Sequence, residues 1–349
     1  MRFLATAIIS ALTTSGALAQ SPGAIDTVFL NRAIRAQVDS GFTGVVLVAD
    51  GDSVILRRAF NSRATHLGET SAFWIASITK SFTAAAVVRL QTQGRLTVRD
   101  SLSRFFPSAP VDKRAITLHQ LLTHTAGLGG TGTGGGVVER TGAVRRILAQ
   151  QLIYPPGDGY RYGDDDYELL AAVIEVVTGR PWQEVVQHEL LDPARLRHTG
   201  FWCGPWRNLP RPVASVDGVR STCGKGAAAD WGHRGANGMA ATADDLLAWT
   251  RVLRSETRGG TREFAAIDTP QVLVRHEGRF DISYGYGARI YTSRGKVAEV
   301  MYSGSGDDGH TSIIRQLASG ITIIVLSSAG EHHGTTWSAY VAAQLGSRE

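Results

Sequence analysis

A serine and a lysine three residues apart form the first pattern in this sequence that predicts chemistry. They lie in the run Trp74-Ile75-Ala76-Ser77-Ile78-Thr79-Lys80, and a helix is predicted from Ser77 to Gln93, ended by Gly94. Residues three apart on a helix share one face, so we expect the amine to lie beside the hydroxyl. A neutral amine there accepts the hydroxyl proton and makes the serine a nucleophile. A helix-capping serine followed by a solvated lysine would satisfy the same pattern.

The pattern recurs at Ser293-Arg294-Gly295-Lys296. We interpret this copy as a hairpin turn, because it falls between two predicted strands and no helix brings its side chains onto one face. The chain has only four lysines, at positions 80, 113, 225 and 296, among 36 basic residues. Arginine keeps its proton whereas lysine can release it, so each lysine is a candidate for chemistry.

Composition bounds the class of protein. The chain has 349 residues, 43% hydrophobic and 19% charged, with a net charge of +5, which is typical of a globular protein with a sizeable core and excludes disorder. The pI of 9.4 comes from scattered basic residues, so we expect no nucleic-acid partner. No segment after the N-terminal one reaches about 18 consecutive apolar residues, so no membrane anchor is expected.

The first nineteen residues have the features of a signal peptide. Arg2 supplies a positive charge, Phe3 to Leu12 is apolar but too short to span a bilayer, and Ala17-Leu18-Ala19 is a small-x-small cleavage site. We therefore expect cleavage after Ala19 and a periplasmic or secreted protein. A buried helix is the alternative, although this stretch has no polar face.

Export permits disulfides, and the chain has two cysteines, Cys203 and Cys223. An even count in an exported chain favours a bridge between them, with two free thiols as the alternative.

The predicted elements place strands at both ends of the chain and helices between them. Strands are predicted at 44–49, 53–60, 285–291, 297–302, 311–317 and 321–327, and helices at 24–38, 77–93, 117–122, 167–177, 243–253 and 336–345. We expect an α/β (α+β) fold with an antiparallel sheet flanked by the N- and C-terminal helices. The mature chain, 20–349, would form an α/β part (about 20–105 and 285–349) and an inserted, mostly helical part (about 106–284), with a cleft at their junction.

Several further segments resemble the serine β-lactamase and penicillin-binding protein superfamily, in its class C-like branch, in the same order along nearly the whole mature chain. The first is Ser77-x-x-Lys80, and Leu122-Thr123-His124-Thr125-Ala126-Gly127-Leu128 is similar to the family's Leu-Thr-His-Thr-Ser-Gly-Leu segment. Tyr162-Gly163-Asp164 is similar to Tyr-x-Asn, and Tyr302-Ser303-Gly304 falls where the family has Lys-Thr-Gly or His-Thr-Gly. The remaining matches are Leu190-Leu191-Asp192-Pro193, Thr199-Gly200-Phe201 and the run from Gly238 to Leu246.

The resemblance implies a β-lactamase/transpeptidase-like fold and a role for each matched residue. Ser77 is the implied acylated nucleophile, and Lys80 and Tyr162 share the proton transfers. The backbone N–H groups of Ser77 and Ser305 form the implied oxyanion hole, and Asp164, Tyr302, Ser303 and Gly304 line the substrate site. A packed aromatic residue is the alternative for Tyr162, the role we expect of Tyr160 and Tyr167.

Two residues depart from the family pattern. Asp164 stands in place of Asn, and a carboxylate near Lys80 would keep the amine charged and shift proton transfer to Tyr162; its alternative is a helix N-cap. Tyr302 stands in place of Lys or His and removes a cation for the substrate's carboxylate. We interpret Arg289, on a preceding strand, as a solvated strand residue; replacement of that cation is the alternative.

Two other patterns do not meet the requirements of a nucleotide or metal site. Gly130-x-Gly132-x-x-Gly135 matches a dinucleotide fingerprint but lacks the strand before it and the helix after it. His119 and His124 are five apart, which is not the spacing of a zinc-binding helix. We expect no metal and no cofactor.

These observations predict an exported serine hydrolase that forms an acyl-enzyme on Ser77. A small ester or a D-amino-acid peptide is the expected substrate, with a β-lactam as the first alternative. A binding or assembly module of the same fold, with decayed catalysis, is the second. The sequence does not define an oligomeric state.

Overall fold

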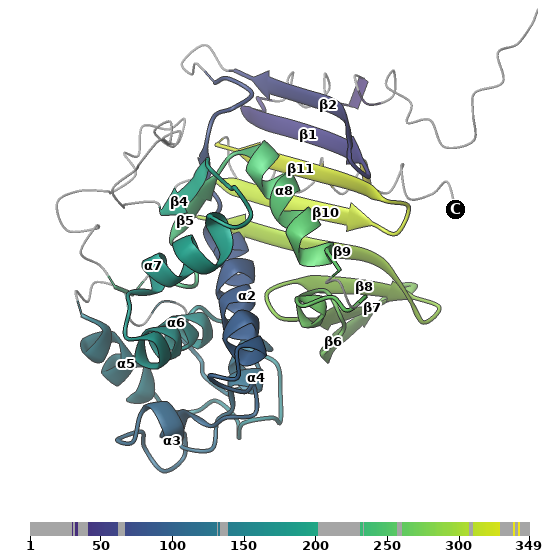
Figure 1. Cartoon of the computed structure of the whole chain (residues 1–349). Coiled ribbons are helices and arrows are strands. Elements are labelled where there is room, and N and C mark those ends of the chain that lie inside the picture. Colours follow the sequence, from purple (N-terminus) through teal and green to yellow (C-terminus); the bar gives the residue numbers. More distant parts are fainter. Residues whose placement is uncertain are drawn as a thin grey trace, which may run out of the picture.

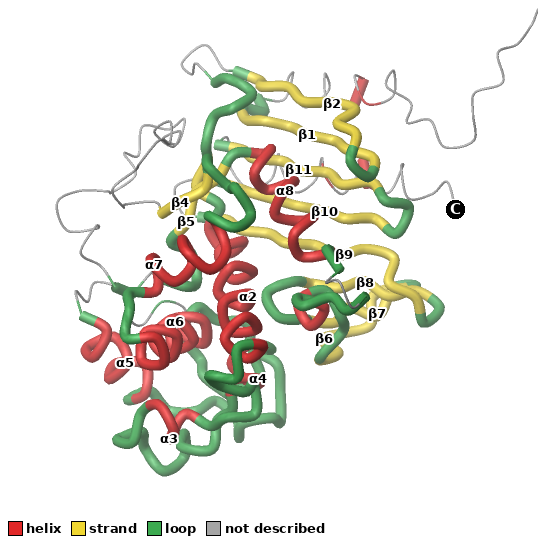
Figure 2. Tube along the Cα trace, in the orientation of Figure 1, coloured by secondary structure: helices red, strands yellow, loops and turns green. Residues whose placement is uncertain are grey.

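The main layer of the protein is an eight-stranded antiparallel sheet in the order β2-β1-β11-β10-β9-β8-β7-β6 (Figures 1 and 2). A computed structural model describes residues 30, 32–33, 41–61, 67–130, 132, 139–201, 231–232, 234–256, 260–306, 310–328, 338 and 341–342. The strands of this sheet are β1 (Gly44–Asp50), β2 (Ser53–Phe60), β6 (Val272–Glu277), β7 (Phe280–Tyr284), β8 (Arg289–Ser293), β9 (Lys296–Ser305), β10 (Thr311–Leu317) and β11 (Ile321–Ser327). The antiparallel α/β fold expected from the sequence is confirmed.

The second copy of the Ser-x-x-Lys pattern is the turn that joins β8 to β9. Ser293 pairs with Lys296 in the antiparallel register, and Arg294 and Gly295 have φ values of +50° and +76°. Two consecutive positive φ values are typical of a tight hairpin turn. This confirms that the second copy has no helix on which to place its hydroxyl and amine.

The helices and helical turns between β3 and β6 gather on one side of the sheet (Figure 1). They are the short turn η1 (Ala76–Ile78) and the helices α2 (Thr79–Thr92), α3 (Leu102–Phe105), α4 (Leu118–Leu122), α5 (Arg140–Leu148), α6 (Asp165–Thr178), α7 (Trp182–Val186), η2 (Gln187–Leu191), α8 (Ala243–Arg254) and η4 (Ala265–Ile267). A small second sheet, β3-β5-β4, consists of β3 (Phe73–Trp74), β4 (Thr199–Phe201) and β5 (Met239–Ala241).

The α2 helix is the centre of the fold. Eleven of its 14 residues are buried, because it is rich in alanine and contacts α6, α7 and η2. A helix that is apolar on all sides belongs in the interior. The buried position holds the Ser77–Lys80 turn rigidly at the junction of the helical and sheet parts.

Strand alternation divides the apolar residues of the sheet into two cores. On β1, Val45 and Leu47 belong to the large cluster shared with the helices, whereas Val46 and Val48 belong to a smaller cluster with Leu30 and Val341 on the other face. Successive side chains of a strand point to opposite faces, so a sheet covered on both sides has continuously apolar strands.

The α/β part extends further than the expected boundary at residue 285. Both β6 and β7 belong to the large sheet, although the sequence analysis assigned residues 106–284 to the helical part. The edge strand β6 was missed because four of its six residues are exposed, and a solvated strand carries little apolar periodicity.

Several predictions fall on residues that the structure does not describe. The N-terminal leader, Cys203 and Cys223 all lie outside the described residues, as does most of each predicted terminal helix. Among the helices that are described, none has the length and apolar character needed to span a bilayer.

Candidate active site

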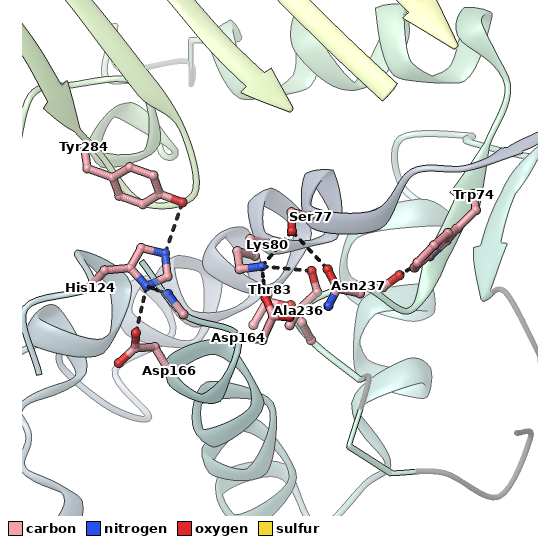
Figure 3. A network of polar contacts seen from close by, with 12 residues as sticks. Trp74, Ser77, Lys80, Thr83, His124, Asp164, Asp166, Ala236, Asn237 and Tyr284 are labelled. Carbon is pink, nitrogen blue, oxygen red and sulfur yellow. Dashed lines mark hydrogen bonds and ion pairs between the residues drawn. The ribbon is translucent and has the colours of Figure 1, made fainter. Parts of the chain in front are cut away.

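The Ser77 hydroxyl and the Lys80 amine meet where β3 leads into α2. Lys80 Nζ donates a hydrogen bond to Ser77 Oγ at 2.9 Å (Figure 3). Ser77 lies in the η1 turn and Lys80 in the first turn of α2, as the spacing predicted. Ala76, directly before the serine, has a φ of +43°, which is a costly conformation for a residue with a Cβ. The chain therefore turns sharply at the point where it presents the serine.

Lys80 is surrounded by acceptors. Besides Ser77 Oγ, its Nζ donates to Asp164 Oδ1 at 2.7 Å and to the Ala236 carbonyl at 3.4 Å. An ammonium group has three hydrogens, so these three acceptors match the charged form. Burial would lower the pKa of Lys80, but the interactions of its amine with Tyr162 and Asp164 outweigh this effect, and the pKa is raised. Lys80 is therefore an ammonium ion in the resting site.

Asp164 has the first of the two roles that the sequence left open, that of a carboxylate beside Lys80. It occupies the N-cap position of α6, but its side chain makes no capping hydrogen bond. Its carboxylate instead receives Lys80 on Oδ1 and the amide of Asn237 on Oδ2, at 2.7 Å each. The carboxylate is thus a partner of Lys80 at the site, as expected for an acid in place of the family's Asn.

Asn237 is a site residue that the sequence analysis missed. Its Nδ2 must face Asp164, because a carboxylate only accepts hydrogen bonds, and this fixes Oδ1 as the acceptor of the Ser77 hydroxyl at 3.0 Å. The only signal available was its place directly before the family-like run that begins at Gly238. An Asn therefore faces Asp164 from another segment.

The segment that carries Asn237 is tied to the helix and strand around Ser77. The Thr83 hydroxyl donates to the Gly235 carbonyl at 2.7 Å, and the Met239 N–H donates to the Thr79 hydroxyl at 3.2 Å. The Trp74 indole N–H donates to the Asn237 carbonyl (Figure 3). These bonds hold the Asn237 amide in place before substrate binds.

Tyr162 lies beside the lysine and faces the same pocket as the serine. Lys80 Nζ is 4.8 Å from the centre of its ring. Tyr167, one of the two rival tyrosines, has the structural role expected of it, because its buried hydroxyl donates to the Leu122 carbonyl at 2.9 Å. The structure therefore brings Ser77, Lys80 and Tyr162 together, as the family resemblance implied.

An open pocket lies over the serine. Ser77 and Tyr162 line it together with Tyr284, Gly287, Arg289, Met301 and Ser303. A Cβ on Gly287 would come within 3.0 Å of the backbone of Lys80 and Ser81, so the turn between β7 and β8 packs directly on α2. This close approach brings Tyr284 and Arg289 to the pocket from the two strands that flank the turn.

Strand β9 supplies Ser303 to the pocket but not Tyr302. Tyr302 is 2% exposed and does not line the pocket, and its surroundings include Arg254 and Asp268, whose charges act on its hydroxyl. Burial is the main reason that the pKa of this hydroxyl is raised; Asp268 raises it as well, whereas Arg254 lowers it. Neighbouring residues of a strand point to opposite faces, so Ser303 and Tyr302 cannot both face the substrate. The expectation that Tyr302 binds substrate is wrong for this reason.

The two expected donors of the oxyanion hole lie where β9 meets the η1 turn. A Cβ on Gly304 would come 2.7 Å from the Ser77 nitrogen and 2.3 Å from the Ile75 carbonyl oxygen. Only glycine permits this contact between strand and turn. Ser305 follows as the last residue of β9, so the structure is compatible with its backbone N–H acting beside that of Ser77.

Among the described residues, no three His, Cys, Asp or Glu side chains are arranged to hold a metal ion.

Comparisons with known proteins identify the class that this fold and site define. The Beta-lactamase family matches residues 30–345, and the chain belongs to this family of serine hydrolases. It is 29% identical to "Esterase EstB" of Burkholderia gladioli over 279 residues, which cover 66% of this chain and 69% of the esterase. It is 28% identical to "Putative penicillin-binding protein PbpX" of Bacillus subtilis over 183 residues, 51% of this chain. That match covers less than half of PbpX, at 46% of its length.

Solved structures confirm the fold. A penicillin-binding protein homologue from Pyrococcus abyssi superposes with a TM-score of 0.78 at 22% identity, over 92% of this chain and 77% of that one. A D-stereospecific amidohydrolase from Streptomyces superposes with a TM-score of 0.70 at 23% identity, over 89% and 98%. The fold class and the family predicted from the sequence are therefore confirmed.

Proposed function

We propose that this protein is an exported serine hydrolase that cleaves a small ester or a D-amino-acid peptide through an acyl-enzyme on Ser77. The observation that carries the proposal is the 2.9 Å hydrogen bond from Lys80 Nζ to Ser77 Oγ at the floor of a pocket that Tyr162 also lines. The contact between these three groups argues against a decayed module.

Acylation begins when Ser77 Oγ attacks the substrate's carbonyl carbon. The Ser77 proton passes to the Tyr162 oxygen as Tyr162 delivers its own proton to the leaving group, so the tyrosine ends the step as it began. Lys80 stays an ammonium ion and stabilises the negative charge that develops on the reacting oxygens. Water then attacks the acyl-enzyme by the same relay in reverse and releases Ser77.

Arg289 and Ser303 give the pocket its preference for a class of substrate. A guanidinium and a hydroxyl beside the nucleophile suit a substrate that carries a carboxylate close to the scissile bond. A D-amino-acid peptide with a free C-terminus has such a group, and so does a β-lactam. Similarity to an esterase and to a D-stereospecific amidohydrolase supports a small acyl compound.

Three substrates separate these possibilities: 4-nitrophenyl butyrate, N-acetyl-D-alanyl-D-alanine with its C-terminal amide as the matched control, and a chromogenic cephalosporin. We expect turnover of the ester or the free dipeptide, with the free dipeptide at least about tenfold better than its amide because a hydrogen-bonded charge pair contributes about 1.5–3 kcal/mol. Arg289→Gln should remove that preference, whereas Arg279→Gln, which changes an arginine outside the pocket lining, should keep it. A kcat/KM highest for the cephalosporin would favour the β-lactam alternative, and no turnover of any of them would contradict the proposal.

Export and the disulfide are part of the same proposal. Intact-mass analysis of protein secreted by the host should give a chain that begins at Gln20 and is two mass units lighter before reduction than after it, if Cys203 and Cys223 are bridged. Retention of Met1 would contradict the signal peptide, and an unchanged mass on reduction would contradict the bridge.

A further inference from the structure

A second polar cluster lies behind Tyr162, and the proposed mechanism does not use it. It consists of His124, which follows α4, Asp166 in the first turn of α6, and Tyr284 at the end of β7 (Figure 3). His124 Nδ1 is 2.7 Å from Asp166 Oδ2, and His124 Nε2 is 3.2 Å from the Tyr284 hydroxyl. The cluster therefore joins the helical part to the sheet across the floor of the site.

The local backbone is shaped to place the His124 ring. His124 has a φ of +57°, which a non-glycine residue adopts at a cost, and its carbonyl accepts the Arg161 N–H at 2.9 Å. Its ring lies against that of Tyr162, with the centres 4.5 Å apart. A strained, fully buried histidine in contact with a catalytic side chain points to a functional constraint rather than to simple packing.

The hydrogen bonds define which atom carries each proton. The Gly163 N–H points at His124 Nδ1 at 3.4 Å, so Nδ1 is an acceptor and Asp166 is the donor that reaches it. The other oxygen of Asp166 is buried and has no hydrogen-bond partner among the described residues, which suits the carbonyl oxygen of a neutral acid. Burial raises the pKa of Asp166 and, with the charges of Lys80 and Arg289, lowers that of His124, so both groups are neutral.

With Nδ1 as acceptor, the proton of the imidazole lies on Nε2 and is donated to the Tyr284 oxygen. Tyr284 keeps its own proton, because burial raises the pKa of its hydroxyl well above the usual value. The Tyr284 hydroxyl proton therefore points away from His124. Tyr284 lines the pocket together with Arg289, so the pocket is where this donor is used.

We propose that Tyr284 is a substrate-binding residue, whose hydroxyl donates a hydrogen bond to an oxygen of the bound acyl compound, and that His124 and Asp166 are positioning residues that fix the direction of this donor. The inference rests on the proposed function, because it concerns the same pocket. It adds a fixed neutral donor to the lining of the pocket.

Tyr284→Phe tests the donor, with Tyr286→Phe as the matched control. Tyr286 is also a buried tyrosine, with its hydroxyl 2.8 Å from Nδ1 of His119, but it is absent from the pocket lining. With N-acetyl-D-alanyl-D-alanine or 4-nitrophenyl butyrate, whichever is turned over, we expect Tyr284→Phe to raise KM about tenfold with kcat changed less than threefold, since loss of uniform binding acts on KM. A KM equal to that of Tyr286→Phe would overturn the role of Tyr284.

Asp166 variants test the direction of the proton. An Asn side chain presents an N–H where the neutral acid presents its O–H, so the KM of Asp166→Asn should stay close to the wild-type value. Asp166→Leu has no such donor, and its KM should rise about tenfold. In ¹⁵N spectra at pH 7, His124 should be the neutral Nε2–H tautomer in the wild type and in Asp166→Asn. A His124 imidazolium, or Asp166→Asn as impaired as Asp166→Leu, would overturn the arrangement.

The two proposals fail in different ways. If a fluorophosphonate probe leaves Ser77 unlabelled and no substrate is turned over, the proposed function fails. If Ser77 is labelled and substrate is cleaved, but Tyr284→Phe and the His124 tautomer disagree with the expectations above, only the present inference fails.

Discussion

Asp164 and Asp166 are two residues apart at the start of α6, and the site uses them in opposite protonation states. Asp164 forms an ion pair with Lys80, and its side chain is 20% exposed. Asp166 is 2% exposed and forms a neutral pair with His124. The Lys80–Asp164 pair is therefore charged, whereas Asp166 belongs to a neutral hydrogen-bonded cluster with His124.

The difference follows from the partners more than from the carboxyl groups. In water, the pKa of Lys exceeds that of Asp by about 6.5 units, and the pKa of His exceeds it by about 2.6 units. Transfer of the proton from the acid to the base therefore gains about 9 kcal/mol in a Lys–Asp pair and about 3.5 kcal/mol in a His–Asp pair. Burying a pair of charges costs several kcal/mol for each ion. That cost exceeds the smaller gain but not the larger, so the lysine pair stays ionised and the histidine pair does not.

Lys80→Met removes the ion pair with Asp164 and should have the largest effect on activity. The variant keeps the shape of the side chain but removes the ammonium, leaving Asp164 without its counter-ion. We expect kcat/KM to fall by at least about 10³-fold, because the residues of a catalytic unit fail together. The melting temperature should also fall, since an unpaired buried charge is costly. Activity within tenfold of the wild type would show that the ammonium is not part of the mechanism.

Asp164→Asn tests whether Lys80 owes its charge to this carboxylate. Removal of a nearby negative charge lowers the pKa of a buried lysine, so the alkaline limb of the kcat/KM profile should move to lower pH by about 1–3 units. Asp166→Asn is the matched control, because replacing a neutral acid removes no charge and should leave that limb in place. Equal shifts in the two variants would contradict the proposed difference between the two aspartates.

Asn237→Ala should have a smaller effect. It removes the acceptor of the Ser77 hydroxyl and a donor to Asp164, so we expect kcat/KM to fall about tenfold. Asn61→Ala, which removes an amide that bonds the Leu67 backbone, serves as the control. An Asn237→Ala enzyme as active as the control would remove Asn237 from the site.

Asp166→Asn should change how the free energy of unfolding depends on pH. The pKa of Asp166 is raised by folding, so the folded state binds more protons than the unfolded one, and its stability falls as pH rises from about 3.9 toward the folded pKa. The Asn variant does not lose stability in this way. The difference between its free energy of unfolding and that of the wild type should therefore increase with pH, by up to about 1.4 kcal/mol per pH unit. Urea unfolding at pH 5 and pH 7 measures the difference, and a gap that narrows with pH would contradict a neutral Asp166.

The sequence predicts the parts of the site that are close together along the chain. Ser77 and Lys80 share a helical turn, and Tyr162 and Asp164 lie in one family-like segment, so spacing and resemblance found them. Asn237 was missed because it meets Ser77 across 160 residues, and no local pattern encodes that contact.

Strand orientation accounts for the other differences. A resemblance assigns Tyr302 and Ser303 to one motif, but the alternation of a strand sends only Ser303 to the pocket. Arg289 and Tyr284 reach the pocket because the turn between β7 and β8 packs on α2, which depends on the tertiary fold. The solvated strand β6 carries too little apolar pattern to be recognised from the sequence.

Trapping the acyl-enzyme shows directly whether Ser77 is the nucleophile. The protein is mixed with 4-nitrophenyl butyrate, quenched in acid within the first turnover, and digested for peptide mass spectrometry. We expect one butyryl group on Ser77 in the wild type and none in Ser77→Ala, with loss of turnover in the variant. A butyryl group on another residue, or turnover that persists in Ser77→Ala, would contradict it.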